Sequence, residues 1–274
     1  NVQRALANNS VNYKEKPDVG TFMREWLSLY DSKSGERGIY NGMSAKKTVE
    51  QLNERYEDGD GNHVLRRDPR NDFGTNPCSE IILRSREFCN LSEIVVRRED
   101  TRESLKEKVR SATILGTFQS TLTEFKYLSK EWKRNCDEER LLGVSLTGIM
   151  DNPITNGTRS GLKELLEELR DIAYETNKEW SDKLGIPTSA AITCVKPSGT
   201  VSQLVDSASG IHARHSPFYL RTVRADNKDP LCKLMQEMGF PNEADVTKPE
   251  HTTVFSFPMK TPKGAVCRMD MTAL

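Results

Sequence analysis

Asn76-Pro77-Cys78-Ser79-Glu80 is the stretch that decides how the rest of the sequence is interpreted. It places an amide, a thiol and a carboxylate at alternate positions, and alternate side chains of an extended segment point to the same face. Two β-like runs, 81–83 and 88–96, flank a polar turn at 84–87. This pattern predicts a β-hairpin that brings Cys89 back near Cys78, with a donor, a sulfur and a base on one face.

The composition is that of a well-solvated protein without net charge. The 274 residues are 35% hydrophobic and 29% charged, with 40 Lys+Arg against 40 Asp+Glu. A chain of this length can bury a substantial core, as one large domain or two smaller ones. The charge balance gives no support to nucleic acid or an anionic membrane as a partner, and no apolar run is long enough for a transmembrane helix. We therefore expect neither partner and a cytoplasmic location.

The six cysteines are spread widely, without a C-x-x-C pair or a histidine at zinc spacing. In a chain without a visible signal peptide, this spacing argues against both a zinc site and a structural disulfide framework. We therefore expect no bound metal. The remaining cysteines outside the 76–89 region are interpreted as small buried hydrophobic residues, namely Cys136, Cys194, Cys232 and Cys267.

Helical and strand-like patterns alternate along the chain, which indicates an α/β fold. Helices are predicted at 22–30 (capped by Thr21), 44–56, 101–128 and 161–183, the last ended by Gly185. A buried strand is predicted at 189–196 and a short strand at 254–257, and 135–140 is interpreted as a charged cap. The apolar run 141–148 is compatible with either a buried strand or a tightly packed helix.

A second chemically suggestive element is Pro197-Ser198-Gly199-Thr200-Val201-Ser202-Gln203, between a predicted strand and a helical turn at 201–205. Free N–H groups at a helix N-terminus bind phosphate, and the hydroxyl groups of Ser198, Thr200 and Ser202 add further donors. There is no lysine after Gly199, so this is not a P-loop. Taken alone, the segment is better explained as an ordinary helix N-cap.

His212, Arg214 and His215 lie close together in sequence. Two histidines three residues apart can ligate a metal, but no carboxylate or cysteine completes the set at a suitable spacing. We interpret the segment 209–216 as a hydrogen-bonded loop at the rim of a site. The chain also starts at Asn1 and stops at Leu274 without a helix stop or tail, and we expect it to be an internal piece of a longer protein.

Three segments together resemble the ribonucleotide reductase family. Phe73 to Ile81 with Phe88-Cys89-Asn90-Leu91 is similar to the active-site loop of that family, and 142–148 and 195–203 are similar to two further family segments in the same order. The eleven-residue step from Cys78 to Cys89 resembles the adenosylcobalamin-dependent (class II) enzymes. The amino-acid sequence as a whole is most similar to the ribonucleoside-triphosphate reductases of that class.

The resemblance implies a ten-stranded α/β barrel whose central finger loop carries a radical cysteine, with residues 1–274 forming part of this single catalytic domain. It implies that Cys78 is the thiyl-radical residue, that Glu80 is the general base for the ribose 3′-hydroxyl, and that Asn76 binds substrate hydroxyls. Cys89 would be one of two cysteines that supply the electrons and end as a disulfide. Pro197, Ser198, Gly199, Thr200 and Ser202 would hold the substrate phosphates.

The resemblance also implies partners. These are a ribonucleoside di- or triphosphate, adenosylcobalamin as the cofactor, a thioredoxin-type or other dithiol reductant, and the rest of the parent polypeptide. The second reducing cysteine is expected upstream of Asn1, and the cysteines that re-reduce the pair downstream of Leu274. We therefore expect that residues 1–274 alone do not turn over.

Three alternatives stay open at this point. A class I large subunit has the same Asn-x-Cys-x-Glu pattern but receives its radical from a metal-containing partner subunit. A non-catalytic half of a split assembly would also carry these segments. A thiol–disulfide binding protein without radical chemistry would need an exposed cysteine of low pKa, but it gives no reason for Glu80 or the 197–203 turn.

Overall fold

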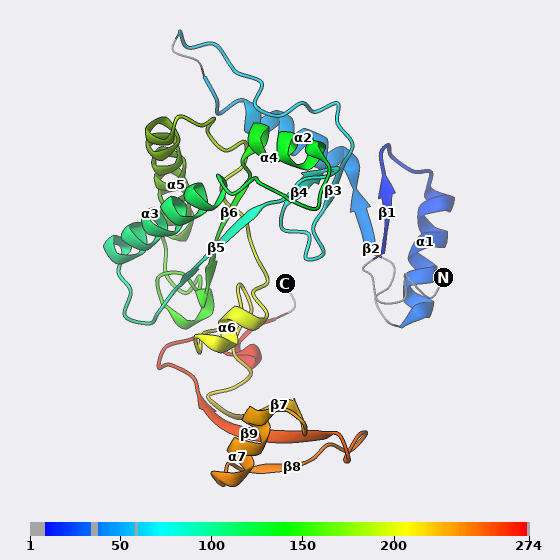
Figure 1. The fold of residues 1–274 in the computed structure, drawn as a ribbon, viewed down its shortest axis with the longest axis vertical. Helices are drawn as coiled ribbons and strands as arrows, with labels where there is room; N and C mark the ends of the chain where they lie inside the picture. The colour runs from blue at the N-terminus through cyan, green and yellow to red at the C-terminus, as the bar shows by residue number, and fades with distance from the viewer. Residues whose placement is uncertain (1–8, 34–37, 58–59, 273–274) are drawn as a thin grey trace. The chain divides into compact units, whose positions relative to one another are not determined.

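The computed structural model describes residues 9–33, 38–57 and 60–272 and divides the chain into two compact units (Figure 1). Unit 1 takes the chain up to Ile94 together with Thr101–Leu146 and Lys163–Pro197. Unit 2 consists of Val95–Asp100, Thr147–Leu162 and Ser198–Leu274. Helices and strands alternate along the chain, so the mixed α/β class predicted from the sequence is confirmed.

The strands of unit 1 pair differently from the predicted hairpin. β3 (Phe73–Thr75) pairs antiparallel with β4 (Ile82–Arg84), and β5 (Asn90–Val95) pairs with β6 (Leu142–Thr147). The prediction that 81–83 and 88–96 pair with each other is therefore wrong. The cause is a contact between separate elements. Phe73 in the short β3 packs against Ala45 and Val49, and in this position β3 pairs with β4.

β5 and β6 run in the same direction. Asn90 N–H donates to Leu141 O at 2.9 Å and Val96 N–H donates to Thr147 O at 2.8 Å, so both strands advance together. Parallel neighbours need a long crossover, and here it contains α3 (Arg102–Gln119) and α4 (Lys130–Glu139). The run 141–148 is therefore a strand. The predicted strand 189–196 is reduced to backbone hydrogen bonds with β6 and one parallel bridge, between Val144 and Thr193.

The helices of unit 1 follow the sequence pattern with three corrections, two of which concern α3 and α4. α5 (Leu162–Leu184) matches its prediction, and Gly185 follows with a φ of 64°. α3 ends at Gln119 rather than near 128, because hydroxyl groups at 120 and 121 bond back to carbonyl groups of its last turn. The segment 135–140 is largely helix α4 rather than a cap, since its inner residues are buried against other parts of unit 1.

The first elements of unit 1 are β1 (Ser10–Tyr13), α1 (Val19–Ser32), β2 (Gly38–Asn41) and α2 (Gly42–Asn53), with β1 parallel to β2. α1 is capped by Asp18, whose carboxylate accepts from Thr21 N–H, so the predicted cap at Thr21 is wrong. The predicted apolar face of α1 is present but exposed, and α1, which is described in full, has no buried residue.

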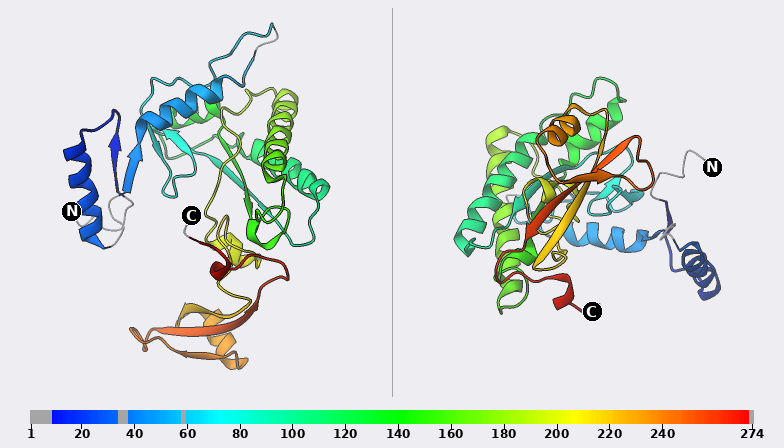
Figure 2. Two further views of the ribbon diagram at one scale, coloured as in Figure 1. Left: turned by 180° about the vertical axis from the view of Figure 1, so that it is seen from behind. Right: turned by 90° about the horizontal axis from the view of Figure 1, so that it is seen from below.

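Unit 2 is built on a three-stranded antiparallel sheet in the order β7–β9–β8 (Figure 2). Its strands are β7 (Phe218–Asp226), β8 (Asn242–Ala244) and β9 (Thr252–Lys260), and α7 (Pro230–Glu237) contacts β9 through Gln236 and Thr253. The predicted strand 254–257 is the centre of β9, which continues through Pro258. Proline is accepted there because β8 pairs only with residues 253–255, so that β9 has a single neighbour at 258.

The rest of unit 2 includes the five-residue helix α6 (Thr200–Leu204) and two short 3-10 turns, Ile149–Asp151 and Arg268–Asp270. The helical turn predicted at 201–205 is thereby confirmed. Throughout the part of the chain that the structure describes, no helix combines the length and apolarity that crossing a membrane requires.

Candidate active site

The segment Asn76–Glu80 forms the turn of the β3–β4 hairpin. Ser79 N–H donates to Asn76 O at 2.9 Å, and Ser79 has a φ of 62°. The Asn76 side chain closes the turn, since its Oδ1 accepts from Ile81 N–H at 3.1 Å. The segment is therefore not extended as predicted, but Asn76, Cys78 and Glu80 still lie together because one tight turn contains all three.

The three side chains of this turn have different surroundings. Cys78 is exposed, so its thiol is open to a reactant. Asn76 and Glu80 are half-buried. One oxygen of Glu80, Oε2, is shielded from solvent and has no hydrogen-bond partner within the described chain. A shielded carboxylate oxygen without a donor is costly unless a ligand supplies one.

Cys89 lies just before β5 and packs, half-buried, against the apolar cluster of Ile81 and Leu141. Burial raises the pKa of the Cys89 thiol to about 11, and the negative charge of Glu80 adds to this rise. The Lys196 ammonium acts in the opposite direction. Cys89 therefore keeps its S–H hydrogen at neutral pH and lies within electrostatic reach of Glu80, although the predicted hairpin does not form.

Cys194 belongs to the same group of residues, which sequence reasoning did not foresee. It is half-buried rather than buried, and it packs against the cluster that contains Cys89. Burial raises the pKa of the Cys194 thiol to about 12, and Glu80 and Cys89 add to the rise. The available signal was the alternation of Cys194 and Lys196, which places both on one face of an extended segment. Cys136, Cys232 and Cys267 are buried as predicted.

The turn predicted to hold phosphates is divided between the units, with Pro197 in unit 1 and the rest in unit 2. Gly199 is the N-cap residue of α6, and no side chain donates or accepts a capping hydrogen bond at this end of the helix. Ser202 is buried and its hydroxyl donates to the carbonyl groups of Ser198 and Gly199, both at 2.8 Å. Gly199 and Thr200 are exposed, while Ser198 is buried with an Oγ that lacks a hydrogen-bond partner within the described residues.

The loop 209–216 is hydrogen-bonded, as predicted. His212 Nδ1 lies 3.0 Å from Ser209 O, and both histidines are exposed. Arg214 is buried between Asp151 and Asp206, with Nε 2.9 Å from Asp151 Oδ1 and Nη1 2.8 Å from Asp206 Oδ1. The arginine therefore links these two acidic residues by ion pairs within unit 2.

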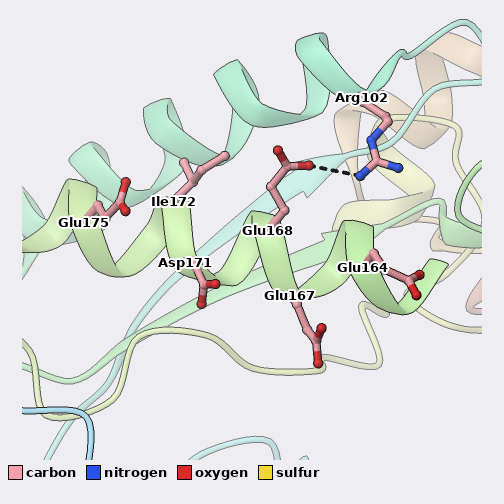
Figure 3. Close-up of a pocket in the computed structure, with 7 residues that line it drawn as sticks. All are labelled: Arg102, Glu164, Glu167, Glu168, Asp171, Ile172 and Glu175. Atoms are coloured by element: carbon pink, nitrogen blue, oxygen red, sulfur yellow. Dashed lines mark hydrogen bonds and ion pairs between the residues drawn. The ribbon is translucent and has the colours of Figure 1, made fainter. Parts of the chain in front are cut away.

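An acidic hollow lies along α5 in unit 1 (Figure 3). Its carboxylates are exposed or half-exposed, and Glu168 is already paired with Arg102 at 3.1 Å and Lys106 at 2.5 Å. Within residues 9–33, 38–57 and 60–272, no group of three His, Cys, Asp or Glu side chains is arranged to hold a metal ion. We therefore interpret this hollow as a solvated surface.

Comparison with known proteins identifies relatives, although no family model matches the chain. The adenosylcobalamin-dependent ribonucleoside-triphosphate reductase of Lactobacillus gasseri is 27% identical over 94% of this chain and 36% of its own length. The enzyme of the same name from Euglena gracilis is 31% identical over 73% of this chain and 27% of its own length. The chain thus spans about a third of the length of such relatives.

Solved structures of ribonucleotide reductases have a similar fold. A B12-dependent (class II) ribonucleotide reductase superposes with a TM-score of 0.68 and 24% identity, over 95% of this chain and 38% of its own. The class Id ribonucleotide reductase alpha subunit of Actinobacillus ureae gives a TM-score of 0.53 and 17% identity, over 84% of this chain. At these identities the structures establish a shared fold.

Proposed function

We propose that this chain, which is homologous to part of the adenosylcobalamin-dependent ribonucleoside-triphosphate reductases, carries the central chemistry of ribonucleotide reduction. It would form part of one ten-stranded catalytic barrel, with the 76–81 turn as the tip of the finger loop. The observation that carries the proposal is the grouping of an exposed thiol, a carboxylate with a shielded and unpartnered oxygen, and a half-buried second thiol that packs against Ile81 at the end of the same turn.

Each residue has a role that fits its surroundings. The Cys78 thiyl radical would take the 3′-hydrogen of the ribose, and the exposed position of Cys78 at the turn permits this contact. Glu80 would take the proton of the 3′-hydroxyl through its unpartnered oxygen, which promotes loss of the 2′-hydroxyl as water. Asn76, whose Oδ1 is held by Ile81 N–H, would donate from its amide nitrogen to a substrate hydroxyl.

The electrons would come from Cys89 and a second cysteine outside this chain. Two S–H groups are oxidised to one disulfide, and the ribose carbon gains the hydrogen that replaces its hydroxyl. The raised pKa of Cys89 suits this role, since it keeps the hydrogen on sulfur until the substrate needs it. A dithiol reductant would then restore the pair. The 197–202 turn would contact the substrate phosphates through the exposed Gly199 and Thr200.

Adenosylcobalamin, when bound, supplies the carbon radical that starts the reaction. The feature of this chain that fits it is Cys78, whose exposed sulfur is free to lose a hydrogen atom. The class I alternative shares the fold at a TM-score of 0.53, and it differs in the source of the radical. The names of the relatives favour the cobalamin-dependent reaction with a triphosphate substrate.

The test is turnover of the full-length protein with a ribonucleoside triphosphate and a dithiol, with and without adenosylcobalamin. We expect strict dependence on the cofactor and complete loss of activity in Cys78→Ser. Activity that needs a second protein instead of cobalamin would support the class I alternative. Activity that survives Cys78→Ser would refute the radical role of this cysteine.

A further inference from the structure

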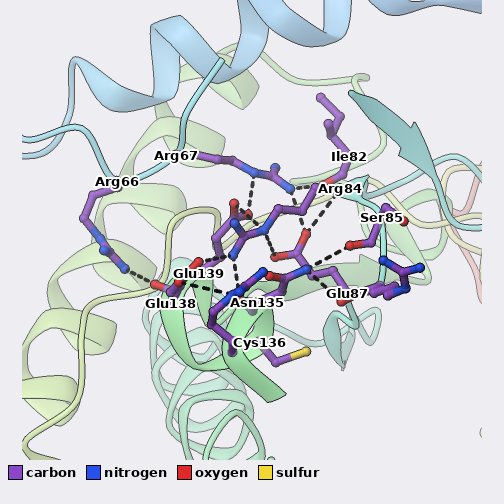
Figure 4. Close-up of polar contacts among 12 residues, drawn as sticks. Arg66, Arg67, Ile82, Arg84, Ser85, Glu87, Asn135, Cys136, Glu138 and Glu139 are labelled. Carbon is purple, nitrogen blue, oxygen red and sulfur yellow. Dashed lines mark hydrogen bonds and ion pairs between the residues drawn. The ribbon is translucent and has the colours of Figure 1, made fainter. Parts of the chain in front are cut away.

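The turn at 84–88, which precedes Cys89, packs on a cluster of four largely buried charged side chains (Figure 4). These are Arg67, Arg84, Glu87 and Glu139. Arg67, Glu87 and Glu139 are at most 3% exposed, and Arg84 is 15% exposed. Arg67 lies 3.2 Å from Glu87 and 2.6 Å from Glu139, and Arg84 lies 3.4 Å and 3.1 Å from the same carboxylates. Each carboxylate is thus held between two guanidinium groups, and loss of one partner would leave a buried charge uncompensated.

Glu87 closes the turn itself. The backbone N–H of Arg84 donates to Glu87 Oε2 at 3.1 Å, which joins the end of β4 to the residue two before Cys89. Asn135 in α4 donates to the carbonyl oxygens of Ser85 and Arg86 at 2.9 and 3.2 Å. Arg86 has a φ of 56°, a conformation that costs free energy in a residue with a Cβ. The contacts with Glu87 and α4 hold the turn in this conformation.

Cys89 is fixed on both sides by this arrangement. Phe88 N–H donates to Cys136 Sγ at 3.4 Å, and the Phe88 ring stacks on Trp132 with 4.6 Å between ring centroids. On the other side, Asn90 N–H begins the bonding between β5 and β6. A rigid turn therefore orients the thiol toward the cluster of Ile81.

We propose that Glu87 is a positioning residue for Cys89, acting through the closed 84–88 turn and, at a pH where its carboxylate is ionised, through its charge. The part of this inference that concerns turnover rests on the function proposed above, whereas the part that concerns the thiol does not. Glu87 also acts electrostatically on Cys89 from its place behind the turn. Loss of its carboxylate should therefore both loosen the turn and favour the thiolate.

The test is alkylation of each cysteine in the full-length protein from about pH 7 to about pH 12, followed by peptide mass spectrometry. Glu87→Ala opens the turn, and we expect Cys89 to react about tenfold faster as its thiol becomes exposed. Glu87→Gln keeps the shape but removes the charge, and we expect the midpoint of the Cys89 pH profile to fall by about half a pH unit. In the active enzyme, Glu87→Ala should lower kcat and leave KM unchanged.

Glu138 provides the matched control, because it also pairs with Arg84, at 2.7 Å, but is 52% exposed. Glu138→Ala and Glu138→Gln should change the alkylation of Cys89 by less than about twofold. Equal effects of the substitutions at 87 and 138, or an unchanged midpoint in Glu87→Gln, would overturn the proposal. If Glu87→Ala does not fold, the alkylation rate of Cys89 is measured in Asn135→Ala instead. This variant removes hydrogen bonds to the turn and changes no charged residue. A protein that reduces no ribonucleotide leaves this result intact, since alkylation requires no turnover.

Discussion

Leu91 packs directly over Gly143, so closely that any side chain at position 143 would collide with it. A Cβ there would also lie 3.0 Å from Ile81 Cδ1 and 3.2 Å from Cys194 Sγ. The glycine therefore allows β5, the 76–81 turn and the Cys194 segment to meet over β6. The candidate site depends on this close approach.

Gly143→Ala should destabilise the protein by about 1–3 kcal/mol, because overpacking forces these side chains apart. Chemical denaturation measures the change. Gly116→Ala is the control, since a Cβ at Gly116 in α3 would meet Leu142 at an ordinary 3.5 Å. Alanine also favours the helix there, so this variant should be neutral or up to about 1 kcal/mol more stable. Equal stabilities of the two variants would contradict the packing argument.

Asp151→Asn should destabilise the protein by about 3–5 kcal/mol, because the positive charge of the buried Arg214 loses its buried counter-ion. Both side chains of this pair are at most 4% exposed. The hydrogen bonds from Arg214 to Asp151 raise the pKa of the guanidinium, against the effect of burial. Asp206→Asn changes the other partner of Arg214, which is 64% exposed, and should cost less than about 1 kcal/mol. Thermal unfolding of the two variants under one condition distinguishes these costs.

Stability should fall as the pH rises from about 5 to about 9. Burial raises the pKa of Glu87 from 4.5 to about 8, with Glu139 adding to the rise and Arg67 opposing it. In this window the folded protein binds a proton that the unfolded chain has released, so the unfolding free energy decreases with pH. Arg84, Cys89 and Cys136 also interact with Glu87. Denaturant titrations across this range should show the slope, and Glu87→Gln should flatten it.

Glu80→Gln should lower turnover of the full-length enzyme by about 10²–10⁴-fold, as expected for loss of a general base. The amide keeps the shape of the side chain, so substrate affinity should change little. Ser79→Ala, in the same turn, is the control and should keep most of the activity. Steady-state kinetics with a ribonucleotide and a dithiol measure the turnover of both variants. Loss of activity in Ser79→Ala together with normal activity in Glu80→Gln would contradict the prediction.

Cys78 should be the first cysteine to be alkylated in the native protein, because it is exposed at the turn. Cys89 and Cys194 should react slowly at neutral pH, since burial raises their pKa to about 11 and about 12. Their rates should rise about tenfold for each pH unit below these values. Rapid reaction of Cys194 at neutral pH would contradict the burial found here.

The sequence by itself determined the features that arise locally. The apolar stripe and Gly185 define α5, and the run 141–148 forms a strand or helix that any α/β core would bury. The chemistry of Asn76, Cys78 and Glu80 is also local, because five consecutive residues keep these groups together whether the segment is extended or turned. For that reason the candidate residues could be named although the backbone conformation was predicted wrongly.

Only the tertiary structure decided which segments meet. β4 pairs with β3 rather than β5 because Phe73 is anchored on α2, a contact that no pattern within 73–96 contains. Cys194 reaches the site because Gly143 has no side chain, and the ion pairs behind Cys89 join residues as far apart as Arg67 and Glu139. Such contacts depend on how separate elements fill space together. Periodicity reports which face of one element is apolar, but it does not say what packs against that face.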